Sequence, residues 1–385
     1  MSLDSLPFEI FRDIASPLST RDLRALSLVN KKLLPFAQTL LFETVSLTLS
    51  AFWFKENDPS KDLDALAKWK RDCFFRTLSS LPSFASSISS LTLQVDPVSF
   101  NGSPRVSLTI SLLRTATSLR HLHLDGFYSG KGTLPSGVIN VVPSNLQSLK
   151  IGPLVFDQAG LEKILNRLTS LESLDLSRTR LVGSGELIPD DVVLSDKLVQ
   201  LRVPRTDADW SPFFHSLLQK ASKSLKSFDG PFISVQTLST QDFPFLQRLN
   251  LVCGYLATDG KYYDSFYKHD SQPLFRDLRL ALSKTPQLRQ LCIESQVSNC
   301  FYTSTMEQFN AVNIFDFMPI TITTLTFSEP YLFPPHALVR YLASTSASVN
   351  LKSLVIGERE RFYPDNREAL QHVLELCRMR GIRLS

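Results

Sequence analysis

A six-residue pattern, apolar-x-x-apolar-x-apolar, recurs along most of the chain and constrains its fold more than any other feature. Between Ile88 and Leu246 the copies start roughly 21 to 31 residues apart, and two longer gaps of about 42 and 34 residues then indicate insertions. Self-similarity at such a period is typical of a stacked repeat architecture. The copies are ISSLTL from Ile88, LRHLHL from Leu119, LQSLKI from Leu146, LESLDL from Leu171, LVQLRV from Leu198, LKSFDG from Leu225, LQRLNL from Leu246, LRQLCI from Leu288, ITTLTF from Ile322 and LKSLVI from Leu351.

The pattern has a simple structural meaning. Alternate side chains of a strand face opposite sides, so the last two apolar residues of each hexamer point inward together, and the first enters the core from the preceding turn. The segments 159–170, 210–224, 274–286 and 336–348 between the hexamers show helical spacing of apolar residues. A single strand and helix cannot bury their apolar faces alone, so we expect stacked units with one continuous core.

This arrangement resembles the leucine-rich repeat family over roughly residues 85–385. The resemblance implies an α/β fold, a curved solenoid with parallel strands on its concave face and helices outside. The asparagine that usually follows each strand in the family is missing, and Thr179 stands in its place in one repeat. The segment 364–385, with Gly381 near its end, predicts a helix that caps the array.

The opening residues lack the hexamer in our interpretation and predict three short helices instead. Leu6, Ile10 and Ile14 recur at helical spacing, and Pro7 stands near the first turn. Ser19-Thr20-Arg21-Asp22 has the form of a capping box that starts a second helix. We expect Asn30 to cap the third.

These elements resemble the F-box over roughly residues 3–47, most closely in LPxEI from Leu6 and LxLVNK from Leu26. The chain is then similar to fungal-type F-box/leucine-rich repeat proteins. We expect an F-box at 1–47, a linker or helical cap at 48–84 with a helix over about 63–78, and the repeats at 85–385.

The F-box resemblance implies a function in which this chain itself forms and breaks no covalent bonds. Family members dock on the small adaptor subunit of a cullin-RING (SCF-type) ubiquitin ligase and hold a protein substrate near the donor thioester. The alternative is a leucine-rich repeat scaffold with no ligase role. The resemblance assigns adaptor binding to seven residues, some of which must instead form the core of the helical unit: Leu6, Pro7, Ile10, Ile14, Leu23, Leu26 and Val29.

A protein substrate would meet the concave face, where residues flanking the middle leucine of each hexamer point outward. The signs of charge there are mixed, which fits a protein partner better than a polyanion, although an ordinary solvated face is the alternative. The candidates are His121, His123, Lys150, Asp175, Arg202 and Arg248, joined on this surface by Asp229, Asn250, Gln290 and Cys292. An insertion at 252–275 adds Tyr255, Tyr262, Tyr263 and Tyr267, as binding residues or as packing on its own repeat.

Composition excludes several other classes. A net charge of +4 over 385 residues demands neither nucleic acid nor an anionic membrane as partner. Five scattered cysteines without a CxxC indicate free thiols in a reducing compartment, and with no visible signal peptide we expect a cytoplasmic or nuclear protein. No HExxH, GxSxG or P-loop is present. We therefore expect no metal, no cofactor and no catalysis, including at Cys292.

Overall fold

The structure of the chain is a computed structural model. It describes residues 7–29, 31–48, 73–74, 76–77, 82–95, 104–126, 136–182, 187–189, 192–205, 211–253, 272–295, 314–328, 335–344, 348–357 and 367–385. The contacts between Cα atoms divide the chain into two compact units. The first unit is Met1–Ser173 with Thr179–Val182, and the second is Leu174–Arg178 with Gly183–Ser385.

The first unit begins with helices and continues as a parallel sheet. Its strands are ordered β1-β2-β3-β4, and a separate small sheet pairs β5 with β7. The strands are β1 Thr44–Thr48, β2 Ser90–Val95, β3 His121–Gly126, β4 Ser148–Ile151, β5 Val155–Asp157 and β7 Arg180–Val182. The helices are α1 Phe8–Ala15, α2 Thr20–Val29, α3 Leu34–Glu43, α5 Pro82–Ser87, α7 Pro104–Thr115, α8 Ser136–Ile139 and α9 Gln158–Leu165.

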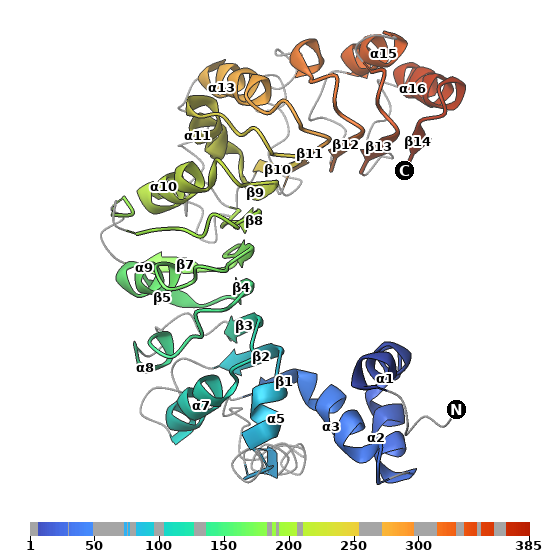
Figure 1. Cartoon of the computed structure of the whole chain (residues 1–385). Helices are drawn as coiled ribbons and strands as arrows, with labels where there is room; N and C mark the ends of the chain where they lie inside the picture. The colour runs from blue at the N-terminus through green and yellow to red at the C-terminus, as the bar shows by residue number, and fades with distance from the viewer. Residues whose placement is uncertain are drawn as a thin grey trace, which may run out of the picture. The chain divides into compact units, whose positions relative to one another are not determined.

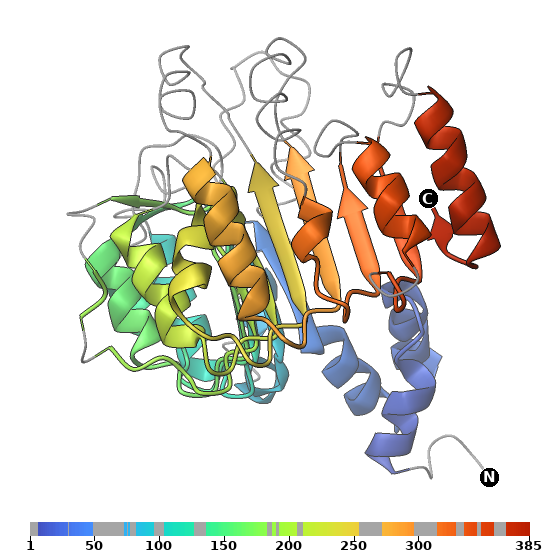
Figure 2. The same ribbon diagram turned by 90° about the horizontal axis from the view of Figure 1, so that it is seen from above.

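The second unit holds the longer part of the parallel sheet, with its described helices on one side of the strands (Figure 1). We call the other side, which no described helix of this unit covers, the open strand face. Seen from above, β10 to β13 lie side by side and point the same way (Figure 2). In sheet order the strands are β6 Ser173–Asp175, β8 Gln200–Arg202, β9 Ser227–Pro231, β10 Arg248–Cys253, β11 Gln290–Ser295, β12 Thr324–Phe327, β13 Ser353–Ile356 and β14 Arg383–Leu384. The helices are α10 Pro212–Ala221, η3 Phe232–Ser234, α11 Val235–Thr240, α13 Gln272–Ser283, η4 Ile314–Phe317, α15 Pro335–Ala343 and α16 Arg367–Met379.

All ten predicted hexamers form strands of the parallel sheet, so the repeat prediction is confirmed at the level of the fold. The apolar positions of each hexamer are buried, as at Leu119, Leu122 and Leu124, whose exposed fractions are 0, 1 and 0%. The repeats are also joined by a regular backbone hydrogen bond. In both units the second hexamer residue donates its N–H to a backbone carbonyl of the neighbouring repeat, as from Arg120 to Ser89 at 2.8 Å.

The sheet extends by one strand beyond the predicted repeats at each end. β1 pairs in register with β2, with Val45 opposite Leu91 and Leu47 opposite Leu93. The sequence FETVSL from Phe42 in fact fits the hexamer, as does MRGIRL from Met379, which supplies β14 beside β13. The expectation that the opening segment carries no hexamer was therefore wrong, because the third helix runs straight into a strand.

The opening segment forms the three predicted helices, α1 to α3. The capping box is confirmed, because the Ser19 hydroxyl accepts from the Asp22 N–H at 3.2 Å while the Asp22 carboxylate accepts from the Ser19 N–H at 3.3 Å. The third helix starts at Leu34 with Leu33 at its N-cap, and Asn30, its predicted cap, lies outside the described residues. Phe11, Ala15, Leu23 and Leu33 make the core of these helices.

Aromatic and backbone contacts join the three helices to the first repeat. The rings of Phe42 at the end of α3 and Phe84 on α5 stack at 4.8 Å between centroids, nearly parallel. The Glu43 carbonyl accepts from the Ser89 N–H at 2.9 Å. Of the predicted helix over 63–78, only Cys73–Phe74 and Arg76–Thr77 lie within the described residues, and they are helical.

Thr179 takes over part of the role of the missing repeat asparagine. Its hydroxyl donates to the Ile151 carbonyl of the preceding repeat at 3.2 Å, and its side chain is only 3% exposed. Without this donor the buried Ile151 carbonyl would destabilise the folded state, because folding has removed it from water.

The substitution Thr179→Val keeps the shape but removes the donor, and we expect it to lower the free energy of unfolding by about 1–3 kcal/mol. Chemical denaturation measures the loss. The conservative Thr179→Ser, which keeps the hydroxyl, should lose clearly less than Thr179→Val. Equal losses in the two variants would show that the hydrogen bond contributes nothing.

The closing helix is confirmed as α16, and Gly381 follows it with a left-handed φ of 67°. Glycine adopts this conformation without strain, which suits it to the end of a helix. Arg380 donates to the Leu342 carbonyl at 2.6 Å and to the Ser344 carbonyl at 3.2 Å, so it satisfies the carboxyl end of α15. This arginine therefore stabilises the end of the array.

Candidate functional site

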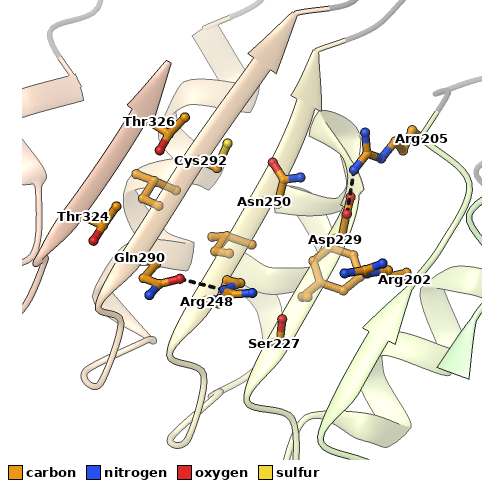
Figure 3. Close-up of a pocket in the computed structure, with 13 residues that line it drawn as sticks. Arg202, Arg205, Ser227, Asp229, Arg248, Asn250, Gln290, Cys292, Thr324 and Thr326 are labelled. Carbon is orange, nitrogen blue, oxygen red and sulfur yellow. Dashed lines mark hydrogen bonds and ion pairs between the residues drawn. The ribbon is translucent and has the colours of Figure 1, made fainter. Parts of the chain in front are cut away.

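The open strand face of the second unit holds a pocket of about 260 Å³ (Figure 3). Most of its polar lining comes from the outward positions of successive strands, with Asp229 opposite Asn250 and Asn250 opposite Cys292 in the parallel register. Parallel strands lie about 4.8 Å apart, so these short polar side chains form one continuous row. The lining residues are Arg202, Arg205, Ser227, Phe228, Asp229, Arg248, Leu249, Asn250, Gln290, Leu291, Cys292, Thr324 and Thr326.

Arg205, one of the residues that line the pocket, pairs with two carboxylates. Its Nη2 donates to Asp229 Oδ2 at 2.8 Å and its Nη1 to Glu294 Oε2 at 3.1 Å, and the second contact joins residues 89 positions apart in the sequence. Asn250 Nδ2 donates to the other Glu294 oxygen, Oε1, at 2.9 Å. We call Arg205, Asp229, Asn250 and Glu294 the inner cluster.

The electrostatics keep the guanidinium of the inner cluster charged. Burial by itself lowers the pKa of Arg205, but the hydrogen bond and negative charge of Asp229 and the charge of Glu294 outweigh it. The pKa of Arg205 is therefore raised above its usual value, and its guanidinium stays charged at any physiological pH.

Two further arginines line the pocket. Arg202 Nη1 lies 3.6 Å from Asp175 Oδ2. Arg248 Nε donates to Gln290 Oε1 at 2.6 Å (Figure 3). The Asp175 carboxylate also accepts from the N–H and hydroxyl of Ser177, at 3.1 and 2.7 Å. Arg248 is exposed, so it can reach a bound partner.

Cys292 lies in the same row but has the properties of an unreactive thiol. Burial, followed by the charge of Glu294, raises the pKa of Cys292 from its ordinary value of 9.0 to about 12. Thiolate, not thiol, is the nucleophile, and a pKa this high leaves almost none at neutral pH. That this cysteine performs no covalent chemistry stays a prediction.

Because the pKa of Cys292 in the folded chain exceeds its ordinary value, the neutral thiol contributes stability below pH 9, and this contribution is lost as the pH rises from 9 towards 12.

We expect iodoacetamide to alkylate Cys292 very slowly in the folded chain at pH 7–9. The Glu294→Gln variant, which removes a charge that raises the pKa of Cys292, should react faster. Mass spectrometry of Cys292 peptides over a pH series measures the rate of alkylation. Rapid alkylation at pH 7 would contradict the assignment.

The structure distributes the predicted substrate residues over both units. In the first unit His121 and Lys150 are exposed on β3 and β4, and His123 is half-buried beside them. In the second unit Arg202 and Arg248 meet at the pocket, whereas Asp175 is only 8% exposed and serves Arg202 and Ser177. The predicted tyrosines lie outside the described residues: Tyr255, Tyr262, Tyr263 and Tyr267.

Sequence reasoning missed two members of the inner cluster, Arg205 and Glu294. Glu294 follows its hexamer directly and shares a face with Gln290 and Cys292, so extending the alternation by one step would have found it. No such signal marks Arg205, which follows Pro204 after β8 and reaches the pocket through tertiary structure.

The helices of the first unit present apolar side chains to solvent. On α1, Phe11 and Ala15 are 1% exposed, but Ile10 and Ile14 on the adjoining face are 48 and 51% exposed. Val29 at the end of α2 is 80% exposed.

The remaining predicted adaptor residues differ in burial. Pro7 is exposed, Leu26 is partly buried against the core of the three helices, and Leu23 is 8% exposed and belongs to that core. Leu23 is therefore a structural residue here. Leu6 lies outside the described residues.

Among the described residues, His121 and His123 included, no group of three or more histidine, cysteine, aspartate or glutamate side chains could hold a metal ion. In the same part of the chain no helix is both long and apolar enough to span a bilayer.

The chain is similar to solved structures, two of which illustrate how distant the similarity is. No protein-family model and no curated protein sequence matches the chain. A solved structure from Bacteroides fragilis is 13% identical with a TM-score of 0.34, over 78% of this chain and 66% of that one, slightly less than two thirds of its length. The leucine-rich repeat-containing protein LegL7 from Legionella pneumophila is 16% identical with a TM-score of 0.32, over 76% of this chain and 81% of that one. Because both TM-scores are below 0.5, the evidence for the repeat fold is the parallel register of the strands and the burial of the apolar hexamer positions.

Proposed function

We propose that this protein is the substrate-recognition subunit of an SCF-type cullin-RING ubiquitin ligase, with α1 to α3 as an F-box that docks on the adaptor subunit and the repeats as the part that binds a protein substrate. The observation that carries the proposal is the exposed apolar face of α1, Ile10 and Ile14, beside the face that Phe11 and Ala15 bury. An eight-residue helix with apolar side chains on both faces is favoured when a partner covers its exposed face, whereas contact of that face with water is unfavourable.

Such a receptor acts through proximity alone. Holding a substrate near the donor thioester raises the effective concentration of its lysines, and no residue of the receptor needs to be reactive. Both the protonated Cys292 and the mixed charges of the open strand face are compatible with this role. We expect no nucleic-acid or membrane partner, and a cytoplasmic or nuclear location, where the ligase works.

Co-expression with the adaptor tests the proposal. We expect a stable complex with the wild-type chain and its loss in Leu6→Ala/Pro7→Ala, because few residues of an interface contribute most of its binding energy. A wild-type chain that never co-purifies with the adaptor, or a double variant that binds as well as wild type, would overturn it.

One observation favours a second candidate, a repeat scaffold without a ligase role. Helix α3 runs directly into β1, and Phe42 stacks on Phe84, so the helices belong to the same compact unit as the first repeats. A helical cap would share these contacts. The candidates differ at Ile10 and Ile14, which a cap has no reason to expose.

A further inference from the structure

Three arginines line the pocket on the open strand face, together with a single carboxylate, that of Asp229. Two more carboxylates lie close to these arginines. Asp175 is 3.6 Å from Arg202, and Glu294 is 3.1 Å from Arg205. Three positive and three negative formal charges therefore occur in and around the pocket, so their accessibility decides which charge a bound partner meets.

Each carboxylate is less exposed than the arginine with which it pairs. The exposed fractions of the side chains are 12% for Asp175 against 43% for Arg202, and 11% for Asp229 and 28% for Glu294 against 35% for Arg205. Charges that contact solvent and a partner directly contribute most to recognition. A group that enters from solvent therefore meets more guanidinium surface than carboxylate surface.

Arg248 is the arginine of this pocket that has no carboxylate partner among the described residues. Its Nε donates to Gln290 Oε1 at 2.6 Å, which leaves its two terminal nitrogens without an acceptor in the described part of the chain. The same hydrogen bond assigns the orientation of the Gln290 amide and makes Gln290 Nε2 a further donor. Because Gln290 holds the guanidinium in place, binding has less side-chain entropy to remove.

Arg202 and Ser227 add donors around the same space. Figure 3 shows the guanidinium groups of Arg202 and Arg248 directed toward one another across β9, on which Ser227 lies between them. The 3.6 Å contact of Arg202 with Asp175 is longer than a hydrogen bond, so this guanidinium can still donate. The half-buried Ser227 hydroxyl can rotate toward a bound group.

Charge and volume together select a carboxylate side chain as the ligand. Asp229 and Glu294 exceed the charge of Arg205 by one, so a group with two negative charges would be repelled, whereas one charge can pair with Arg248. The two terminal nitrogens of Arg248 can form the paired hydrogen bonds that carboxylates make with arginine. A volume of about 260 Å³ is below the roughly 300–1,000 Å³ of sites for drug-sized molecules, so a single side chain suits it better.

We infer that this pocket binds a glutamate or aspartate side chain of a protein partner, whose carboxylate lies between Arg248 and Arg202 and accepts hydrogen bonds from both. The inference deepens the proposed function, on which it rests only for the partner being a ligase substrate. Its test needs no adaptor, so a failed pocket and a failed adaptor interface give separate results.

Calorimetric titration of the full chain with the N-acetyl methylamides of glutamate and aspartate tests the inference. We expect at least one of them to bind with a Kd in the millimolar range, and its neutral amide counterpart, the glutamine or asparagine derivative, to bind about tenfold more weakly. Absence of saturation by either acid, or equal binding of the neutral counterpart, would overturn the inference. Tighter binding of the phosphoserine derivative would overturn the choice of a carboxylate.

Matched variants locate the binding. Arg248→Gln and Arg202→Gln each remove one guanidinium from the pocket, and we expect about tenfold weaker binding in both. Gln290→Glu gives Arg248 a carboxylate partner within the chain and should weaken binding at least as much. The control Arg279→Gln removes an exposed guanidinium from α13, on the other side of the strands, and should bind like wild type.

Arg248→Gln is the decisive variant, because Arg248 is exposed and its partner Gln290 is neutral, so the folded structure loses no ion pair. It gives a result even where Arg202→Gln disturbs the buried Asp175. Wild-type affinity for the acidic derivative in Arg248→Gln would contradict the assigned position.

Discussion

Replacement of Ile10 and Ile14 by aspartate in the full chain is expected to weaken adaptor binding by a hundredfold or more. The two side chains are half-exposed on one face of α1, so a partner that covers them would have to bury two unpaired carboxylates instead. Buried interface residues of this kind commonly contribute about 2 kcal/mol or more each. Calorimetric titration with the purified adaptor measures the change.

The control for this variant is Ile320→Asp, an equal change at a 61% exposed isoleucine of the second unit, which should bind the adaptor like wild type. Both variants should keep the free energy of unfolding within about 0.5 kcal/mol, since the replaced side chains already contact water. A double variant that unfolds would show that α1 needs Ile10 and Ile14 for its own packing. Full adaptor affinity in the folded double variant would contradict the assignment.

Removal of the Arg205 guanidinium should produce the largest loss of local stability in the second unit. In Arg205→Gln, the buried Asp229 and the half-buried Glu294 lose their shared cation. Breaking a fully buried ion pair costs about 3–5 kcal/mol, and we expect about 2 kcal/mol here, because the Arg205 side chain is 35% exposed and partly screened. Hydrogen exchange in peptides of β9 to β11 should then be about thirtyfold faster.

Two comparisons make this prediction specific. Arg248→Gln removes an exposed guanidinium whose partner is the neutral Gln290, so its effect should stay within about 0.5 kcal/mol. The double variant Arg205→Gln/Asp229→Asn should lose less than the sum of the single losses, because the amide at 229 removes one of the two carboxylates that Arg205→Gln leaves unpaired. Additive losses, or an Arg205→Gln variant that exchanges like wild type, would contradict the role of Arg205.

The repeated strands were predictable because burial imposes a period of two on each of them. Leu122 and Leu124 must face the core together, and a pattern of apolar residues records this directly. The terminal strands were missed although FETVSL and MRGIRL fit the same pattern, because the first copy overlaps the end of α3 and the second overlaps the end of α16. Where two elements share residues, a helical interpretation hides the strand.

The pocket was only partly predictable, for a different physical reason. Arg202 and Arg248 occupy the outward positions of their hexamers, so the alternation alone places them on the strand face. The ion pair between Arg205 and Glu294 joins residues 89 positions apart, and no local pattern encodes such a distance. The exposure of Ile10 against the burial of Leu23 was equally hidden, since both fit the apolar spacing of their helices.

Assembly with a cullin tests the account most directly. The full chain is mixed with purified adaptor and cullin–RING subunits and analysed by size-exclusion chromatography with light scattering. We predict one complex that contains all components, and loss of this chain alone from the complex when Leu6→Ala/Pro7→Ala replaces the wild type. Elution of the wild-type chain apart from an intact adaptor–cullin complex would contradict the account.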